Sequence, residues 1–396
     1  MTAQPGKNPF MPGVGTQPPF LAGRDQSIRR FMSVLRGAPE LPANMRLTGL
    51  RGVGKSVLLG EFERVARKDG WGATQVEIQP GHNTDDQVVE VLSAMARRAK
   101  SDLSRMQRVK QAAGEATRRV GSIGMTWEDF TVSYQPFSGE KREDLTRELF
   151  SLIEVAVGKG LAGVVILLDE AQILRDETRR DGEHPLSTLI ASVSMLQRQE
   201  LPLGLVMCGL PSLTGNLLKA RTYTERMFTG EEIGSLQGDD AREAFVRPLS
   251  ESDLSADDDL IQEVIKEVEG YPYFIQLWGR ELWDVADYAG FDRLSLGVLE
   301  QARPEIYRRL DLDFYEPRIS TLTPAEQDVL IASANASYPP LEVREMNEKV
   351  EKTPQNVNVL LGRLVEQGVL YRVRKGEYKY TAPRFHDYLK RQNSSG

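Results

Sequence analysis

The stretch MRLTGLRGVGKSVLL, at residues 45–59, places three glycines and a lysine between a strand-like run and a helix-like run. Glycine adopts backbone angles that are closed to other residues and lets a ligand approach the main chain. The spacing fits the phosphate-binding-loop pattern G-x-x-x-x-G-K-[ST], with matches at Gly49, Gly54, Lys55 and Ser56. The amides of such a loop wrap a polyphosphate at the N-terminus of the next helix. This feature therefore predicts a strand, a loop and a helix arranged around a bound nucleotide.

The polar residues of this loop have expected tasks. Lys55 is predicted to reach the β and γ phosphates, and Ser56 is predicted to hold Mg²⁺. The loop residues predicted to contact the nucleotide are Gly49, Gly52, Val53, Gly54, Lys55, Ser56 and Val57. A glycine-rich turn that matches the pattern by chance is the alternative, and the flanking strand-like and helix-like runs disfavour it.

Length and composition define the class of the protein. A chain of 396 residues with 40% hydrophobic residues suits two or three domains with real cores. Its one cysteine, Cys208, excludes a disulfide framework, and three scattered histidines predict no metal cluster with it. The N-terminal residues lack an apolar run of signal-peptide length, and the longest apolar run, at residues 164–168, is too short to span a bilayer. We therefore expect a reduced, cytoplasmic protein with no membrane insertion.

The charge is unevenly distributed along the chain. The formal net charge is −7, which argues against a protein that coats nucleic acid without specificity. Between residues 352 and 391, however, there are nine Lys and Arg residues and only three Asp and Glu residues. The C-terminal end is therefore basic, and the remainder of the chain is acidic.

Strand and helix patterns alternate from about residue 26 to about residue 230. The predicted strands lie at residues 46–48, 74–78, 164–168 and 203–207, with helices at 57–66, from 85, at 143–157 and at 186–198. Such alternation indicates an α/β fold, a P-loop NTPase parallel sheet with helices on both faces.

Two further patterns follow this α/β region. Strands cease near residue 230, and acidic amphipathic helices continue to about residue 312. Beyond residue 317, helices at 324–333, 341–350 and 354–367 precede a hairpin, which predicts a winged helix-turn-helix. The predicted domains are an extended N-terminal strap at 1–19, a nucleotide-binding domain at 20–229, an all-α lid at 230–316 and a winged-helix domain at 317–396.

An apolar strand that ends in two acids supplies the second part of the predicted site. In GVVILLDEAQIL, at residues 163–174, Asp169 and Glu170 follow the strand at its carboxyl end. The phosphate-binding loop lies at the same edge of a parallel sheet. Asp169 is therefore predicted to bind Mg²⁺, and Glu170 to orient and deprotonate the attacking water.

Six stretches in this order resemble AAA+ ATPases of the origin-recognition type and the similar STAND-like bacterial ATPases. They are FLAGRDQSIRRF from Phe20, GLRGVGKS from Gly49, LLDEAQ from Leu167, MCGLPSL from Met207, TERMF from Thr224 and GYPYFIQLWGRELW from Gly270. The resemblance implies that Phe20 to Arg24 pack near the adenine and that Pro272 belongs to the nucleotide site. It also implies that Arg226 reaches the γ-phosphate of a neighbouring subunit when ATP assembles an oligomer. A surface residue in a charged helix is the alternative for Arg226.

The chain departs from this resemblance at two positions. After the strand that ends at Met207, Cys208, Gly209 and Leu210 stand where a polar sensor residue is expected, and Ser212 is a weak substitute. The lid has Gly-Tyr-Pro at residues 270–272, as in STAND ATPases, where many AAA+ proteins have a sensing arginine, and Arg280 is a poor stand-in. Because phosphoryl transfer depends on positioned charge, we expect slow hydrolysis, which suits a switch better than a motor.

Two regions are candidates for DNA contact. From Arg97 to Arg119 the polar side of a long helix has eight Lys and Arg residues, and the alternative is a solvated helix face. In the helix at residues 354–367 the outward residues are predicted to be Gln355, Asn356 and Arg363, and the hairpin adds Arg372, Arg374, Lys375 and Lys379. These residue types suit base edges and phosphates.

The sequence therefore predicts an ATP-controlled AAA+ switch with Mg²⁺ as its metal, which contacts duplex DNA through the winged helix. One alternative is a STAND-type signalling ATPase whose nucleotide state gates a protein partner and whose winged helix is a packing module. Another is an accessory ATPase of transposition or defence that assembles on DNA as a filament. The basic C-terminal end favours the first interpretation, and the acidic overall charge and the Gly-Tyr-Pro lid favour the second.

Overall fold

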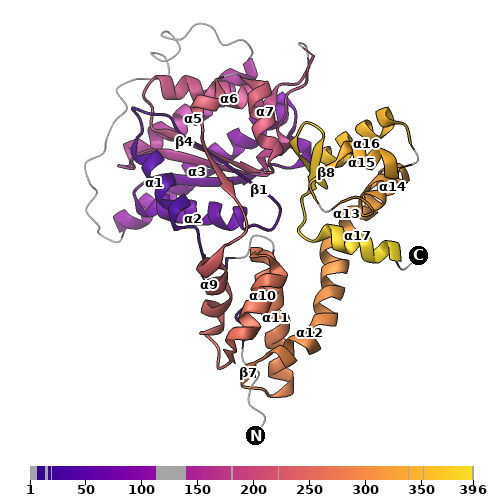
Figure 1. Cartoon of the computed structure of the whole chain (residues 1–396). Helices are drawn as coiled ribbons and strands as arrows, with labels where there is room; N and C mark the ends of the chain where they lie inside the picture. The colour runs from indigo at the N-terminus through magenta and orange to yellow at the C-terminus, as the bar shows by residue number, and fades with distance from the viewer. Residues whose placement is uncertain are drawn as a thin grey trace. The chain divides into compact units, whose positions relative to one another are not determined.

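The chain folds into two compact units, which we call the sheet unit and the helical unit (Figure 1). The sheet unit comprises residues 24–49 and 55–233, and the helical unit comprises residues 1–23, 50–54 and 234–396. This computed structural model describes residues 7–13, 17–18, 20–112, 140–179, 182–221, 223–337, 339–350 and 352–394. The part of the predicted basic helix from residue 113 to Arg119 lies outside the described residues.

A five-stranded parallel sheet forms the centre of the sheet unit, with strand order β2-β3-β4-β1-β5. Its strands are β1 (Ala43–Gly49), β2 (Gly72–Glu77), β3 (Val164–Asp169), β4 (Leu203–Gly209) and β5 (Thr229–Ile233). The predicted parallel α/β sheet is confirmed, and four of its five strands lie at predicted positions.

Helices cover both faces of this sheet. They are α1 (Asp25–Arg36), α2 (Lys55–Lys68), α3 (Asp85–Ala112), α5 (Glu140–Gly158), α6 (Pro185–Arg198), α7 (Ser212–Ala220) and α8 (Thr224–Met227), with short 3-10 turns η1 (Pro80–His82) and η2 (Ala171–Ile173). Ile166 and Leu168 of β3 belong to a core cluster with apolar residues of α3, α5 and α6. Because side chains alternate along a strand, Val165 faces the other side, where Phe31 of α1 stacks on Phe62 of α2 at 4.1 Å between ring centroids.

A buried amide pair joins the beginning of β1 to α6. Asn44 and Gln197 exchange two hydrogen bonds of 2.9 Å, and the Asn44 side-chain oxygen also accepts from the backbone amide of Leu205 at 3.1 Å. Asn44 is fully buried, so these bonds replace those that its amide would make with water. The pair thereby anchors β1 beside β4.

The prediction that strands cease near residue 230 is wrong for β5. This strand pairs in parallel with β1 at the edge of the sheet, and its Glu231 lies opposite Leu47. Glycine and glutamate are uncommon in strands, so TGEEI gives little indication of a strand. An edge strand that is half exposed nevertheless tolerates these residues, because it needs no apolar run. Glu231 is held by Ser27 of α1, whose hydroxyl donates to it at 2.9 Å.

The first part of the helical unit is all-helical apart from one short pair of strands. Its helices are α9 (Gly238–Leu249), α10 (Asp258–Val268), α11 (Pro272–Ala289) and α12 (Leu296–Arg309), and the two-residue strands β6 (Ser255–Ala256) and β7 (Arg293–Leu294) pair in parallel. The predicted helical region after residue 230 is thus present, with β6 and β7 as a small addition. A six-residue π-helix, η3 (Leu310–Tyr315), continues α12.

The second part of the helical unit has the predicted order of helices and hairpin. Its elements are α13 (Glu316–Ser320), α14 (Pro324–Ser333), β8 (Leu341–Glu342), α15 (Val343–Lys349), α16 (Pro354–Glu366), β9 (Leu370–Arg374), β10 (Glu377–Tyr380) and α17 (Phe385–Ser394). Thr323 caps α14 in a capping box with Glu326, and Thr353 caps α16 by accepting from Asn356. Three helices followed by a hairpin is the order predicted for a winged helix-turn-helix, a name that we keep for this region, and the strand β8 completes its small sheet.

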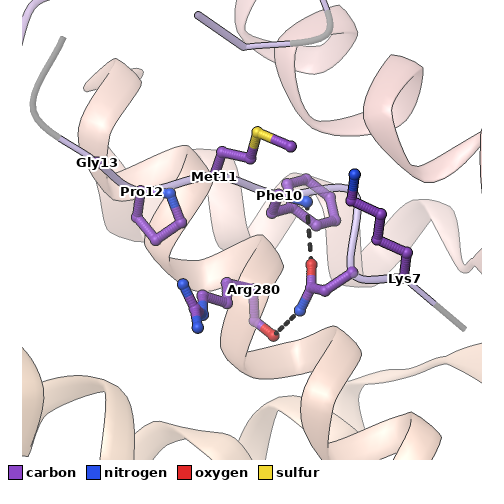
Figure 2. A pocket seen from close by; sticks show the side chains of 7 residues that line it. Lys7, Phe10, Met11, Pro12, Gly13 and Arg280 are labelled. Carbon is purple, nitrogen blue, oxygen red and sulfur yellow. Dashed lines mark hydrogen bonds between the residues drawn. The ribbon is translucent and has the colours of Figure 1, made fainter. Parts of the chain in front are cut away.

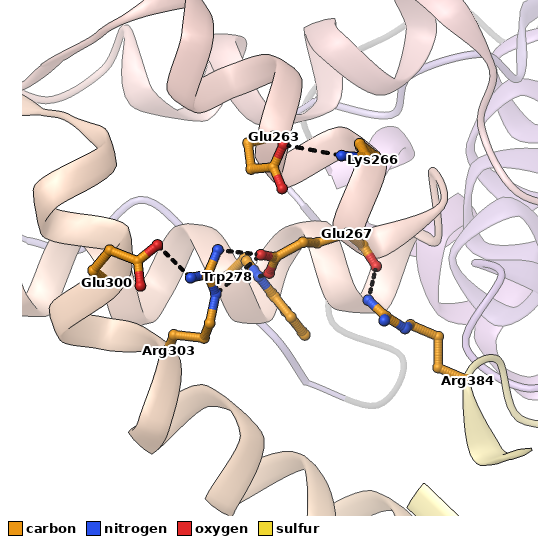
Figure 3. Close-up of polar contacts among 7 residues, drawn as sticks. All are labelled: Glu263, Lys266, Glu267, Trp278, Glu300, Arg303 and Arg384. Carbon is orange, nitrogen blue, oxygen red and sulfur yellow. Dashed lines mark hydrogen bonds and ion pairs between the residues drawn. The ribbon is translucent and has the colours of Figure 1, made fainter. Parts of the chain in front are cut away.

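Ring contacts and hydrogen bonds connect the two parts of the helical unit. Tyr315 of η3 stacks on Phe385 and Tyr388 of α17, and its hydroxyl donates to the Pro383 carbonyl at 2.8 Å. Figure 3 shows a second connection, in which Arg384 donates to the Glu267 carbonyl at the end of α10 at 2.8 Å. The Glu267 carboxylate accepts from Trp278 and from Arg303 in the same network.

The described N-terminal residues 7–13 lie along α11 (Figure 2). Asn8 donates to the Arg280 carbonyl at 3.0 Å and to the Asp284 carboxylate at 2.7 Å. Phe10 packs against Gly279, where an added Cβ would lie 2.4 Å from the Phe10 ring. The side chain of Arg280 lies against this N-terminal segment.

Candidate functional site

The glycine-rich loop leaves β1 at Gly49 and enters α2 at Lys55. Gly52 and Gly54 have φ values of +80° and +88°, in the left-handed region that favours glycine. Lys55, the first residue of α2, is 6% exposed, and Ser56 follows it at the N-terminus of the helix. Amides at a helix N-terminus attract anions, so the chain has the local geometry that a phosphate requires.

Tyr271 covers this loop within the helical unit. An added Cβ at Gly52 would lie 2.9 Å from the Tyr271 ring, so the absence of a side chain there permits the contact. The amide of Tyr273 donates to the Gly52 carbonyl at 3.3 Å. Pro272, which the resemblance assigns to the nucleotide site, lies between these two tyrosines as the first residue of α11.

The two predicted acids lie at the carboxyl end of β3. Asp169 ends the strand and is 5% exposed, while Glu170 has a left-handed backbone with φ +51°. The Glu170 amide donates to an oxygen of the Asp169 carboxylate at 2.9 Å. The two predicted acids are thus adjacent at this edge of the sheet, with the turn at Glu170 directly after the strand.

Gln172 is a residue of this site that the sequence motifs did not indicate. Its side-chain amide donates to the Glu170 carboxylate at 2.5 Å, and its oxygen accepts from the Leu210 amide at 3.0 Å. Gly209 leaves room for this side chain, because an added Cβ there would lie 2.3 Å from the Gln172 oxygen. The glutamine in LLDEAQ was the available signal, since a polar residue two positions after a candidate base can orient it.

Cys208 lies on β4 at the same edge of the sheet. It pairs with Leu47 of β1, and burial together with the nearby Asp169 carboxylate raises the pKa of its thiol well above the usual value. Ser212, the weak sensor substitute, is exposed at the start of α7. The Cys208 thiol and the Gln172 side-chain amide are thus two polar groups near the end of β4.

The residues that the resemblance assigns to the nucleotide site or to assembly lie in different environments. Phe20, in the helical unit, lies under the Arg247 guanidinium at 4.3 Å from the ring centroid. Arg24, in the sheet unit, precedes α1 and is buried. Arg226 is exposed on the four-residue helix α8, and in the described part of the chain it makes no ion pair within 4.0 Å.

The described part of the basic helix makes internal ion pairs. Lys100 and Arg97 of α3 contact Glu148 of α5 at 2.8 Å and 3.4 Å. Together these cations hold the pKa of the Glu148 carboxyl below its usual value although burial alone would raise it. Part of the predicted DNA-contacting face therefore packs α3 on α5, which matches the alternative of a structural helix face.

The residues proposed to meet DNA lie at the surface of the winged helix-turn-helix. The exposed members are Gln355, Asn356 and Arg363 of α16 and Arg372, Arg374 and Lys375 of the hairpin. Val359, one turn after Gln355, is 56% exposed, and Val373 between two hairpin arginines is 48% exposed. Arg374 is paired with Glu377 across the hairpin turn.

Comparison with known families finds matches over two parts of the chain. Residues 21–206 match the family described as "AAA ATPase domain". This region is therefore similar to AAA ATPase domains. The predicted resemblance to AAA+ P-loop ATPases is thereby confirmed, and AAA+ ATPases bind nucleotide, typically with Mg²⁺. Residues 312–389 match a second family, which is described only as a domain of unknown function.

Solved structures and a curated relative are similar over nearly the whole chain. The Walker-type ATPase of Pyrococcus abyssi is 20% identical, with a TM-score of 0.55 over 95% of this chain and 97% of that one. The Aeropyrum pernix ORC2 protein, solved as ADPNP-ADP complexes, is 12% identical, with a TM-score of 0.56 over 97% and 98% of the chains. An uncharacterized HTH-type transcriptional regulator of Methanocaldococcus jannaschii is 22% identical over 91% of this chain and 86% of its own length.

These likenesses place the AAA ATPase domain in a fold of the origin-recognition type, at the level of the fold alone. In the part of the chain that the structure describes, no helix is long and apolar enough to cross a membrane. Nor do the described histidines, cysteines and acids gather in groups of three or more that could hold a metal. The site residues inferred from the sequence stay predictions.

The close approach of Gly209 to Gln172 generates a first prediction. Gly209→Ala should lower ATP hydrolysis by about ten-fold or more, because a displaced Gln172 no longer orients the Glu170 carboxylate. Binding of a non-hydrolysable ATP analogue should change by less than about two-fold, because the phosphate loop is untouched. Phosphate release and equilibrium titration measure the two effects.

The matched control is Gly215→Ala in α7, where an added Cβ meets nothing within 4 Å. This variant should hydrolyse ATP at the native rate. Native hydrolysis by Gly209→Ala would show that Gln172 does not position the base.

Proposed function

We propose that the chain is an ATP-controlled switch, which binds and slowly hydrolyses ATP and contacts duplex DNA through its winged helix. The observation that carries the proposal is the conjunction of a left-handed glycine loop, a buried lysine at a helix N-terminus and an acid pair at the carboxyl end of β3. The predicted division into a strap, a nucleotide-binding domain, a lid and a winged-helix domain belongs to this proposal. A cytoplasmic location also belongs to this proposal, because a free thiol such as that of Cys208 is consistent with a reducing compartment.

Ser56 and Asp169 provide donors that suit Mg²⁺. Both offer oxygen ligands, and Mg²⁺ in nucleotide sites takes few protein ligands and keeps waters and phosphate oxygens as the others. The small number of donors therefore fits this ion, which would neutralise charge on the phosphates. Lys55 would contribute a further positive charge at the β and γ phosphates.

The expected slowness of hydrolysis follows from the polar group at the end of β4. Gln172 donates a hydrogen bond to Glu170 and orients the candidate base. The Cys208 thiol, however, is only a weak hydrogen-bond donor where a stronger polar group would meet the γ-phosphate.

Two substitutions test the nucleotide site. Lys55→Ala should abolish ATP binding, because the phosphates lose the lysine charge of the loop. Glu170→Gln should bind ATP at least as well as the native chain and should lose turnover, because a neutral amide cannot accept the proton. Equilibrium titration and phosphate release measure these effects, and native turnover by Glu170→Gln would refute the assignment of the base.

Assembly forms part of the proposal through Arg226. An exposed arginine on a short helix, with no ion pair in the described chain, is available to a neighbouring subunit. An arginine supplied in trans stabilises charge that develops on the phosphates during transfer. ATP would thus favour a homo-oligomer.

ATP should therefore raise the mass of the native chain in sedimentation or light scattering. Arg226→Ala should lower hydrolysis by about ten-fold or more while ATP binding stays native. Arg29→Ala, an exposed arginine on α1, serves as the control and should behave like the native chain. A chain that stays monomeric with ATP across a wide concentration range would exclude this role.

DNA contact is proposed for α16 and the hairpin. Gln355 and Asn356 suit adenine edges, and the exposed Val359 beside them suits a thymine methyl group. Arg372, Arg374 and Lys375 would meet phosphates, which supply affinity and its dependence on salt. The description of the Methanocaldococcus relative as an HTH-type regulator is consistent with this use.

The second candidate is a signalling ATPase of the STAND type. The contact of Tyr271, in the Gly-Tyr-Pro of the lid, with Gly52 favours it, because a lid that closes on the loop can gate a protein partner. In that case the winged helix would be a packing module, and its exposed cations would be solvated.

Charge reversal separates the two candidates. Arg374→Glu with Lys375→Glu should weaken duplex binding and reduce the slope of log affinity against log salt by about 1 for each phosphate that the hairpin no longer neutralises. Lys266→Glu with Arg293→Glu, two exposed lid cations, is the control and should leave both quantities near native values. Unchanged duplex binding at low salt after the hairpin reversal would favour the signalling candidate.

A further inference from the structure

Arg318 of α13 has an unusual environment within the helical unit. Its guanidinium stacks on the Phe314 ring at 4.0 Å from the centroid and donates to the Phe314 carbonyl. Its Nε is buried and has no hydrogen-bond partner. In the part of the chain that the structure describes, no carboxylate forms an ion pair with it.

A second cation increases this imbalance. Arg51, the residue before Gly52 in the glycine-rich loop, lies close enough to Arg318 that the two like charges repel. Burial, followed by this repulsion from Arg51, lowers the pKa of the Arg318 guanidinium. Two neighbouring arginines, neither of which forms an ion pair with a described carboxylate, create a local excess of positive charge, which an anion would relieve.

A third polar group faces the same place. The Tyr271 hydroxyl is buried and has no partner, although its ring packs against Gly52. The Tyr271 ring packs on Phe274 at 4.9 Å between centroids, and Phe274 packs at 5.3 Å on Phe314, the ring over which Arg318 lies. Because Tyr271 also packs against Gly52, next to Arg51, the three side chains lie in one neighbourhood. A buried donor without a partner is costly, so a ligand that accepts from it would be stabilised.

We propose that Arg318, Arg51 and Tyr271 form an anion site that receives the terminal phosphate of a nucleotide held by the glycine-rich loop. The proposal rests on the nucleotide binding proposed above and adds that Arg318 distinguishes ATP from ADP. Arginine donates to phosphate through two parallel N–H groups, and Nε is one of the available donors. Because Tyr271 packs against Gly52 of the loop, we assign the anion as a phosphate that this loop holds.

The position of Arg318 in the chain gives this contact a consequence. Arg318 lies three residues after Tyr315, whose ring is stacked on α17 of the winged helix-turn-helix. Tyr273, whose amide bonds to the Gly52 carbonyl, stacks on Phe314 at 5.3 Å between centroids. A phosphate bound by Arg318 therefore stabilises the loop, η3 and the winged helix-turn-helix in one arrangement, and ADP does so less.

The test compares ATP and ADP affinity in variants of the full chain. Arg318→Ala should weaken binding of a non-hydrolysable ATP analogue by about ten-fold or more and change ADP binding by less than about two-fold. Arg51→Ala, at an exposed position where folding is not at risk, should also reduce the preference for the analogue. Arg308→Ala is the control, because this exposed arginine pairs only with Glu305 in the described chain, and it should keep the native preference.

The outcomes separate this inference from the proposed nucleotide site. If the native chain binds neither nucleotide, the proposed function fails and the Arg318 site fails with it. If the native chain binds both, and Arg318→Ala and Arg51→Ala keep the native ratio of ADP to analogue affinity, only the Arg318 site is refuted. Equal weakening of both nucleotides by Arg51→Ala would also refute it, because Arg51 would then not act on the terminal phosphate.

Discussion

Parallel pairing of β1, β4 and β3 is the constraint on which the candidate site depends. Strands that run in one direction end at one edge of the sheet, so the glycine loop after Gly49 begins beside the ends of the other two strands. Asp169 and Gln172, at the end of β3, and Cys208, on β4, come from segments that are far apart in the sequence, and the shared direction of the strands brings them to that edge. An antiparallel arrangement of the same runs would send these groups to opposite edges.

The features that could be predicted from the sequence were those with a local signal. The loop pattern, the uniformly apolar strands and the helix caps depend on neighbouring residues, and the structure confirms the elements that they indicated. The strand β5 was not predicted, because its glycine and two glutamates are typical of a turn and only its pairing with β1 makes it a strand. The motifs did not indicate Gln172 or Arg318, because the surroundings of both side chains include residues that are distant in sequence.

The helical unit illustrates a different limit. Amphipathic patterns indicate which face of each helix is buried, but they do not say which helices share a core. Tyr315 and Arg384 connect the lid helices to the winged helix-turn-helix, through ring stacking and through a hydrogen bond to a helix end. No local sequence pattern around either residue predicts this role. The connection between the two regions is therefore evident only in the three-dimensional structure.

The amide pair of Asn44 and Gln197 has a consequence at the opposite end of β1. Strands as apolar as VVILLD and LGLVMCG lack the alternation that usually selects one alignment, so a slip along the strand direction would cost them little hydrophobic contact. It would, however, move Asn44 away from both Gln197 and the Leu205 amide and leave buried polar atoms without partners. A slip of one residue would displace the beginning of the glycine loop by about 3.3 Å relative to the end of β4, more than phosphoryl transfer tolerates. The hydrogen-bonded pair at one end of β1 thus fixes the alignment of the strands, and the geometry of the candidate site at the other end depends on that alignment.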